Sequence, residues 1–225
     1  IAILIVIILG IYFFTSVKEE VPTTKEAAAP VTTVTLEAPS IPWQMCHGTA
    51  QHTGQSAYRG SQTGTLKWKY QYYEPAAGEK IPNPPKSFAI SSDGNIYTSA
   101  IGTLLAFSSE GELLWSVEGL GRGEGGAVAL SPDESTVYAV SGKNLYAYTS
   151  AGTPLWETQV ATDILHGEVA VASDGTLYLG SADSYVYAVH PNDGTILWKF
   201  ETGGSIAPLA SPTLSLDEEI IYVGS

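Results

Sequence analysis

The stretch WQMCHGTAQH, residues 43–52, contains the residue types that bind metals or attach haem. It holds the chain's single cysteine, Cys46, and two of its four histidines. Haem attachment through a C-x-x-C-H motif requires a cysteine at position 43, where the sequence has Trp43. A structural zinc site needs about four ligands, and this irregular segment offers three, from Cys46, His47 and His52. We therefore predict that no metal or haem is bound here.

Five further polar residues could contact a ligand, and they lie in the loops GLGRGEGG (119–126) and ATDILHGE (161–168). The candidates are Arg122, Glu124, Asp163, His166 and Glu168. The last three could form a carboxylate–imidazole cluster for acid–base chemistry, or they could be solvated side chains without a catalytic role. The first loop lacks the G-K-[ST] of a phosphate loop and no helix follows it, so we interpret it as a turn between repeats.

The elements that position these loops follow from a repeat, because the pattern G-x-x-x-W occurs four times. It appears as GTLKW (64–68), GELLW (111–115), GTPLW (152–156) and GTILW (194–198), so that the tryptophans follow one another at steps of 47, 41 and 42 residues. An aspartate turn followed by an aliphatic residue and tyrosine recurs in the same register, with turn aspartates at 93, 133, 174 and 217. A period of about 40 to 45 residues is typical of propeller blades.

The residues between these markers favour β-strands over helical repeats. Segments such as TLYLGS, SYVYAV and NLYAYT alternate at period two and are separated by Asp-Gly and similar turns. One unit is predicted to form four short strands at 167–172, 175–180, 184–189 and 194–200. We therefore predict an all-β chain, a partial β-propeller of about four four-stranded antiparallel blades. Its loops would lead into the innermost strands, which places the five candidates at one end of a central channel.

The recurring tryptophans and glycines have a structural explanation. A large flat ring fills the wedge between neighbouring blades, and the glycine four residues earlier provides a tight turn. The predicted blade-docking residues are Trp68, Trp115, Trp156 and Trp198, with Gly64, Gly111, Gly152 and Gly194. The four turn aspartates occur once per blade, which indicates a turn-capping role in place of a calcium site.

The units at 174–204 (DGTLYLGSADSYVYAVHPNDGTILWKFETGG) and 134–156 (ESTVYAVSGKNLYAYTSAGTPLW) resemble the pyrroloquinoline-quinone-like (PQQ-like) β-propeller repeat. In that family the segment corresponding to 188–198 is the tryptophan-docking motif. The resemblance implies propeller repeats over residues 42–225, incomplete at the C-terminus, in a chain truncated at both ends. It says little about activity, because the same repeat builds quinoprotein dehydrogenases, envelope scaffolds and sensor domains.

The stretch at 43–52 also fits this resemblance. Trp43 and Met45, followed by Thr53 and Gly54, resemble the W-P-M-(x)n-T-G segment that opens many proteins of the family. Cys46 stands where an aromatic residue is frequent, so we expect it to fill a small apolar site. The stretch is therefore predicted to be the start of the propeller.

The residues before this point predict an anchor and a tether. Residues 1–17 begin with fourteen uninterrupted apolar residues, which span roughly 21 Å at about 1.5 Å per residue, and we interpret them as a truncated transmembrane helix. One alternative is a buried core helix of a soluble domain, and a second is a cleaved signal peptide. Residues 18–41 are rich in Pro, Thr, Ala and Glu and predict an extended linker.

Charge and motifs narrow the function. The formal net charge of −13 disfavours nucleic-acid binding. We predict a propeller on the extracytoplasmic side of the cytoplasmic membrane, held by a single-pass anchor and acting as a protein-interaction scaffold or a ligand-binding sensor ectodomain. Its partner would be an envelope protein or a small ligand at the channel, and no cofactor is expected. The alternative is a PQQ-dependent quinoprotein dehydrogenase fragment with PQQ and calcium, but the vicinal cysteine pair of those enzymes is absent from these residues.

Overall fold

The computed structural model describes residues 43–45, 48–52, 63–71, 85, 87–100, 102–121, 126–204, 206 and 211–224. In these ranges every regular element is a β-strand, as the repeat predicts. The predicted anchor (1–17) and linker (18–41) lie outside the described residues. Within the described ranges, no helix has the length and apolar character that crossing a membrane requires.

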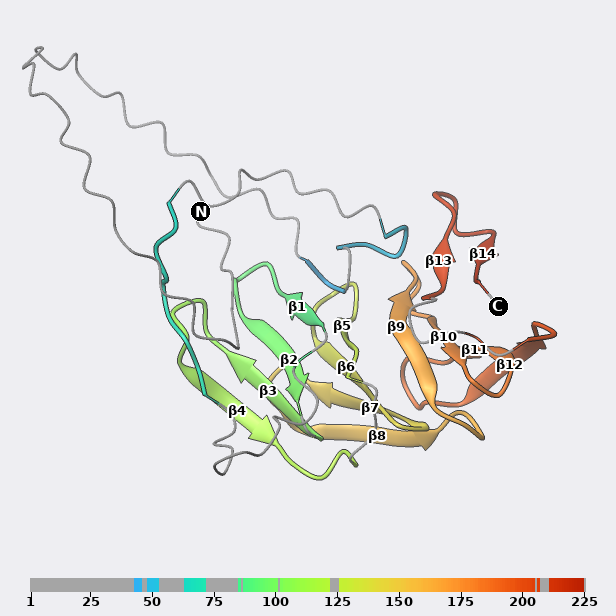
Figure 1. Ribbon diagram of the computed structural model, residues 1–225, viewed down its shortest axis with the longest axis horizontal. Helices are drawn as coiled ribbons and strands as arrows, with labels where there is room; N and C mark the ends of the chain where they lie inside the picture. The colour runs from blue at the N-terminus through green and yellow to red at the C-terminus, as the bar shows by residue number, and fades with distance from the viewer. Residues whose placement is uncertain are drawn as a thin grey trace, which may run out of the picture.

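The strands form three four-stranded antiparallel sheets and one two-stranded sheet, each a simple up-and-down meander. We call these sheets blades 1 to 4, in chain order, and Figure 1 shows them side by side. Their strands are β1 (Phe88–Ile90), β2 (Ile96–Ala100), β3 (Thr103–Phe107) and β4 (Leu113–Val117) in blade 1; β5 (Val128–Leu130), β6 (Thr136–Ser141), β7 (Asn144–Thr149) and β8 (Pro154–Gln159) in blade 2; β9 (Leu165–Val171), β10 (Leu177–Ser181), β11 (Tyr185–Val189) and β12 (Ile196–Glu201) in blade 3; and β13 (Thr213–Leu214) and β14 (Ile221–Tyr222) in blade 4.

The burial of the strands follows from their place in the blade. In blade 2 the middle strands β6 and β7 are buried on both faces, because a neighbouring blade covers each side. The outer strand β8 is mostly exposed, and only alternate side chains are half-buried. The inner strand β5 contacts the inner strands of both neighbouring blades, β1 and β9. This gradient from buried inner strands to exposed outer strands is the arrangement expected of a propeller.

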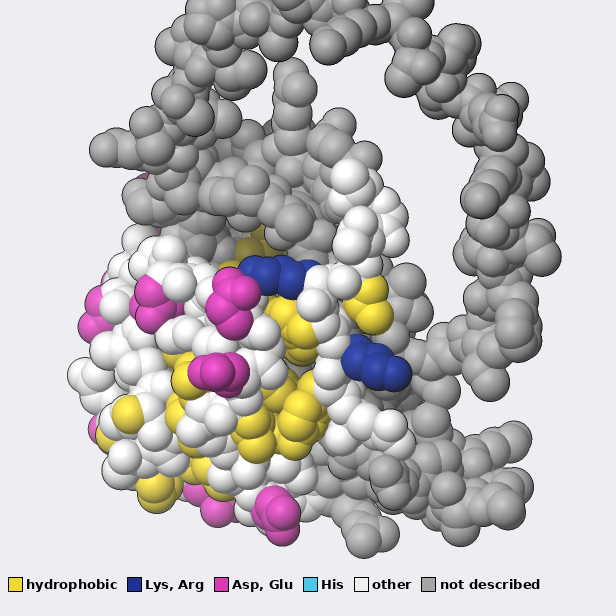
Figure 2. Space-filling view, turned by 90° about the vertical axis from the view of Figure 1, so that its left-hand side faces the viewer, with side chains coloured by type: hydrophobic (Ala, Val, Ile, Leu, Met, Phe, Trp, Pro, Cys, Tyr) yellow, Lys and Arg dark blue, Asp and Glu magenta, His cyan; other side chains and the backbone are white. Residues whose placement is uncertain are grey.

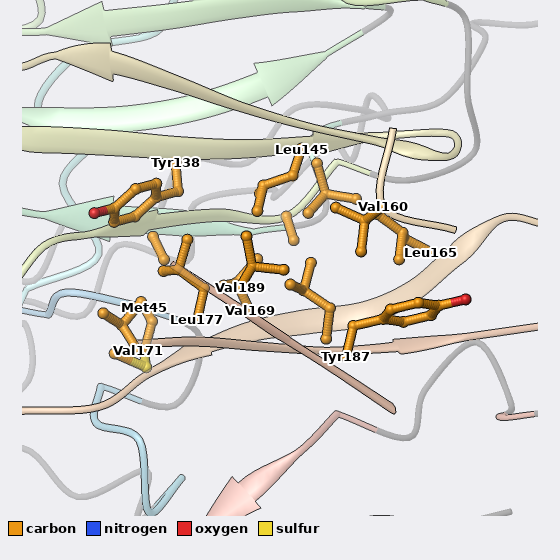
Figure 3. Packing of buried hydrophobic residues seen from close by; sticks show 14 of the residues in the cluster. Met45, Tyr138, Leu145, Val160, Leu165, Val169, Val171, Leu177, Tyr187 and Val189 are labelled. Atoms are coloured by element: carbon orange, nitrogen blue, oxygen red, sulfur yellow. The ribbon is translucent and has the colours of Figure 1, made fainter. Parts of the chain in front are cut away.

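The core consists of side chains packed between adjacent blades. One cluster joins blades 1 and 2 through residues such as Leu104, Val128 and Val137. A larger cluster joins blades 2 and 3, and Figure 3 shows Tyr138 and Leu145 facing the strands that carry Leu177 and Val189. Because each blade buries its faces against its neighbours, stability depends on contacts at every blade boundary.

The outer strands carry an irregularity at the same position in blades 1 to 3. In each of them the leucine before the docking tryptophan is the extra residue of a β-bulge, at Leu114, Leu155 and Leu197. These leucines are 47–50% exposed. Bulges twist an edge strand away from regular pairing and so reduce edge-to-edge association. On the side of the molecule shown in Figure 2, apolar side chains gather in a strip with acidic side chains scattered around it.

Candidate functional site

The meander gives the propeller two chemically different ends. At one end, which we call the turn end, inner strands enter second strands through the turns at 91–95, 131–135, 172–176 and 215–220. The hairpins between the third and fourth strands lie at the same end, because antiparallel strands alternate in direction. At the other end, the loop end, the chain passes from the outer strand of one blade to the inner strand of the next.

The structure describes three of the five candidate ligand-binding residues, Asp163, His166 and Glu168. Arg122 and Glu124 lie outside the described residues. Asp163 is exposed in the loop before β9, where its Oδ1 accepts a hydrogen bond from the Ile164 amide at 2.8 Å. His166 belongs to β9, where its backbone is paired with Gly180. Glu168 is further along β9, half-buried, and its amide donates to the Ser211 hydroxyl of the next blade at 2.9 Å.

A hydrogen-bonded group that the sequence did not indicate lies at the loop end, around Asp183. One oxygen of Asp183 accepts bonds from the Thr162 amide (2.8 Å), the Thr162 hydroxyl (3.0 Å) and the Tyr187 hydroxyl (2.7 Å). The other oxygen, Oδ1, is enclosed and has no hydrogen-bond partner. Lys143 of blade 2 donates to the Thr162 carbonyl, so the group also fixes the loop between blades 2 and 3.

The electrostatics of this group follow from the hydrogen bonds. Burial disfavours the charged form of Asp183, but the bonds from Tyr187, Thr162 and Ser181 outweigh it and lower the pKa of this carboxyl. Burial and the neighbouring carboxylate raise the pKa of Tyr187 above its ordinary value. Tyr187 therefore stays protonated and remains a donor to an ionised Asp183 at neutral pH. In the part of the chain described, no three His, Cys, Asp or Glu side chains are grouped to hold a metal ion.

The predicted docking residues form three equivalent contacts between successive repeats. The indole N–H of Trp115 donates to the Ser150 carbonyl, and that of Trp156 donates to the Pro191 carbonyl, both at 2.9 Å. Each ring lies against the glycine of the next repeat: a Cβ atom at Gly152 would be 2.8 Å from the Trp115 ring, and one at Gly194 would be 2.6 Å from the Trp156 ring. The tryptophans therefore pack against the glycine turn of the following repeat.

The contacts at the two ends of this series differ. Trp68 makes the first contact, against Gly111, and its indole N–H donates to the Ser109 carbonyl at 3.3 Å. Gly64 has nothing within 4 Å of where a Cβ would lie, so it is not a close-packed turn glycine like the other three. Trp198 is 42% exposed, although it contacts Tyr178 as the docked tryptophans contact their own tyrosines, with ring centroids 5.9 Å apart.

The four turn aspartates lie at the turn end and accept local hydrogen bonds, as predicted for turn-capping residues. Asp133, for example, accepts from the hydroxyls of Ser131 at 2.6 Å and Ser135 at 2.9 Å. These bonds, with that of Ser131 the strongest influence, lower the pKa of Asp133. Asp174 accepts the Thr176 amide in the same way, at 2.8 Å. Local turns rather than a ligand therefore account for these carboxylates.

Residues 43–45 and 48–52, which we call the strap, cross the turn end. The carbonyls of Trp43, Gln44 and Ala50 accept hydrogen bonds from the amides of Ile90 in β1 (2.7 Å), Leu130 in β5 (2.8 Å) and Leu214 in β13 (2.9 Å). These three amides occupy equivalent positions, each one residue before an aspartate turn begins. The blue strap in Figure 1 runs past β5 toward β13. Cys46 and His47, which prompted the question of a metal, lie outside the described residues.

Side chains of the strap also fix it to the blades. The Gln44 amide group donates to the Pro132 carbonyl at 3.2 Å, and that of Gln51 donates to the Ser215 carbonyl at 3.4 Å. Met45 is 3% exposed, and Figure 3 shows it beside Val171 in the cluster between blades 2 and 3. These contacts fasten the stretch to blades 1, 2 and 4, and its role as the start of the propeller stays a prediction.

Comparison with known proteins places the fold in a family. No curated protein sequence matches the chain. A crystal structure titled as BamB from Moraxella catarrhalis matches with a TM-score of 0.50 and 17% identity, over 60% of this chain and 42% of that one. The chain thus spans less than half the length of that protein, and the likeness establishes the fold. A family model described as outer membrane protein assembly factor BamB matches residues 100–225. The chain therefore belongs to this family of PQQ-like repeat β-propellers.

Proposed function

We propose that the chain is a membrane-anchored, extracytoplasmic β-propeller that acts as a protein-interaction scaffold. The observation that carries the proposal is the family match over residues 100–225, whose description is that of an assembly factor. Residues 1–17 would supply the anchor and residues 18–41 the tether, as their composition indicates. The partner would be a protein of the cell envelope.

The recurring tryptophans and aspartates of the repeat are engaged in structural contacts, and this supports a binding role rather than a catalytic one. The docking tryptophans are occupied in contacts between blades, and the turn aspartates in local hydrogen bonds. Asp163 is exposed in a loop and bonded to the neighbouring amide, an arrangement suited to surface recognition. A catalytic carboxylate would more often be partly desolvated and placed against a second titratable group.

The loop end is the surface that we propose for the partner. The strap crosses the turn end and covers part of it, whereas the loop between blades 2 and 3 presents the exposed residues Thr162 and Asp163. The bonds from Thr162 to Asp183 hold this loop in one conformation. A preformed loop loses less conformational entropy on binding, which favours affinity.

Site-specific photo-crosslinking in the native host tests this surface. A photoreactive residue at Asp163 should give a defined crosslinked partner, whereas the same residue at the exposed Asn192 of the turn end should not. The crosslinked protein is then purified, and its binding to the wild-type chain and to Asp163→Lys is compared by calorimetry, with at least a tenfold loss expected. Equal crosslinking at both positions, or equal affinity of both chains, would refute the assignment of the loop end.

The proposed location needs a separate test. In a Cys46→Ser background, a cysteine introduced by Asn192→Cys, which lies outside the proposed partner surface, should react with a membrane-impermeant maleimide in intact cells whose outer envelope is permeabilised. Deleting residues 1–17 should move the protein from the membrane fraction to the soluble fraction. Labelling only after lysis, or membrane association that survives the deletion, would contradict the location or the anchor.

A further inference from the structure

We propose that the outer strand of blade 3, β12, is a dimerisation edge that pairs antiparallel with β12 of a second copy of the chain across a two-fold axis. β12 is the terminal strand of its sheet and has β11 on one side only (Figure 1). Pairing of two such edges is a form of strand addition, and a two-fold axis is the commonest symmetry of protein oligomers. The edge lies on the rim of the propeller, and the proposal does not rest on the envelope partner proposed above.

β12 is more exposed than the equivalent strands of blades 1 and 2. In β4 and β8 alternate side chains are half-buried, whereas every side chain of β12 is exposed. Trp198 is 42% exposed and Phe200 is 65% exposed. An edge strand that presents apolar side chains to solvent is a template for pairing with another chain. β12 therefore has both the free edge and the apolar surface that pairing requires.

The part of β12 that follows its β-bulge is regular. Four successive residues, 198–201, pair in register with β11. The Thr202 amide donates to the Ser184 carbonyl at 2.9 Å, and successive residues of an antiparallel pair direct their backbone groups alternately toward and away from the partner strand. The amide and carbonyl groups of Lys199 and Glu201 therefore point away from β11, toward the free edge.

Charge selects the register of the second copy. When the two-fold axis passes beside Phe200, Lys199 of each copy lies opposite Glu201 of the other. Lys199 and Glu201 then exchange backbone hydrogen bonds, and the two Phe200 side chains meet at the closer, non-hydrogen-bonded type of pair. Lys199 lies over the Tyr185 ring, 4.4 Å from its centroid, and among the described residues neither Lys199 nor Glu201 is in an ion pair. Both charges can therefore pair with those of a second copy.

The equivalent edges of blades 1 and 2 lack this complementarity. Counted from the docking tryptophan, their outward positions hold Ser116 and Glu118 in blade 1, and Glu157 and Gln159 in blade 2. The same register would oppose serine to glutamate in one blade and glutamate to glutamine in the other, without a basic residue. Glu157 also accepts a hydrogen bond from Asn144 of its own blade at 2.8 Å. Of the three outer strands in the described residues, β12 alone carries opposite charges that match those of a second copy.

Reversal of the charges tests the pairing, with sedimentation velocity of the complete 225-residue chain in a mild detergent. Lys199→Glu and Glu201→Lys each place like charges opposite one another, so each variant should dimerise about tenfold more weakly than the unmodified chain. An equimolar mixture of the two variants should form a heterodimer as tightly as the unmodified chain dimerises, because opposite charges then face each other at both positions.

The controls separate this contact from other association. Glu157→Lys, on the edge of β8, should leave dimerisation unchanged. All variants retain residues 1–17, so association through that segment is the same in each. An unmodified chain that stays monomeric, or a mixture that associates as weakly as its two components, would overturn the proposal.

Disulfide crosslinking tests the register independently. In a Cys46→Ser background, Phe200→Cys places two thiols beside the two-fold axis, on Cα atoms about 4.5 Å apart, a separation that a disulfide spans. Oxidation with copper phenanthroline should convert most of this variant to a covalent dimer. Leu197→Cys, at a position that is 50% exposed on the same strand, should give little. Equal crosslinking at the two positions would show that the copies meet without this register, and the proposal would fail.

Discussion

Removal of a docking tryptophan tests how the blades are held together, and the chain contains its own control. We predict that Trp156→Ala destabilises the propeller strongly and that Trp198→Ala does so weakly. Trp156 packs between Tyr138 of its own blade and Gly194 of the next, and its indole N–H donates to the Pro191 carbonyl at 2.9 Å. Trp198 has the same place in its blade but is 42% exposed.

The expected magnitudes follow from these contacts. Truncation of a buried tryptophan to alanine costs about 3–5 kcal/mol, and the half-buried Trp156 belongs near the lower limit, at about 3 kcal/mol. About 1 kcal/mol of this is the lost indole hydrogen bond. Trp198→Ala loses mainly its contact with the Tyr178 ring, which is worth about 1 kcal/mol. The difference of about 2 kcal/mol between the two variants is therefore the contribution of the contact with the next blade.

Urea titration and differential scanning calorimetry of the purified chain measure both values. A loss of about 3 kcal/mol should lower the Tm of Trp156→Ala by about 6–12 °C, and that of Trp198→Ala by about 2–4 °C. The slope of the free energy against urea concentration should stay the same if the chain still unfolds as one unit. Equal destabilisation by the two substitutions, or an unchanged Tm for Trp156→Ala, would refute the docking explanation.

Three other predictions can be checked on the same protein. Gly111→Ala should lower the free energy of unfolding, measured by urea titration, by about 2 kcal/mol or more, because its left-handed backbone disfavours a side chain and a Cβ would overlap the Trp68 ring. Gly64→Ala is the control, since nothing lies within 4 Å of where its Cβ would be, and it should lower the free energy of unfolding far less. Similar losses in the two variants would contradict this explanation. Burial raises the pKa of Tyr138 to about 12, so the folded state holds a proton that the unfolded state releases near pH 10. The free energy of unfolding should therefore fall by up to about 3 kcal/mol between pH 10 and 12, and it should fall less in Tyr138→Phe. Equal alkaline losses in the two proteins would show that another group is responsible. The full-length protein supplied with PQQ and calcium should reduce no dye with alcohols or sugars, and alcohol-dependent reduction would favour the dehydrogenase alternative.

The blades could be predicted from the sequence because their information is local and repeated. The strands predicted at 184–189 and 194–200 occur at 185–189 and 196–201, since period-two alternation and Asp-Gly turns fix them within a few residues. The tryptophan step also predicted that the rings lie at blade boundaries. It did not predict that the rings of Trp68, Trp115 and Trp156 each pack against the glycine of the next repeat, because the angle between neighbouring blades cannot be obtained from the sequence alone.

The strap and the Asp183 group could not be predicted, since both depend on contacts between distant residues. Ala50 binds Leu214, and Gln51 binds Ser215, which is 164 residues away. Residues 43–52 have no period and no repeat partner, so the sequence indicated only that the propeller starts there. At Asp183 the one available signal was a tyrosine four residues later, at Tyr187. A group formed by neighbouring blades becomes visible only when the blades are assembled.

Two departures from the repeat explain two of the chain's 23 acidic residues. Directly after the turn aspartate, blades 1 and 3 have glycine, but blades 2 and 4 have Glu134 and Glu218 with a left-handed backbone. This conformation costs about 1–2 kcal/mol for a residue with a side chain. Glu134 accepts the amide and hydroxyl of Ser92 in blade 1, at 2.9 and 2.8 Å. Glu218 binds Ser173 of blade 3 in the same way, at 2.9 and 2.7 Å. Hydrogen bonds to a charged group contribute about 1.5–3 kcal/mol each, which offsets the backbone cost. These two acidic residues therefore act as clamps between blades, and the acidity of the turn end is in part a property of the propeller's own assembly.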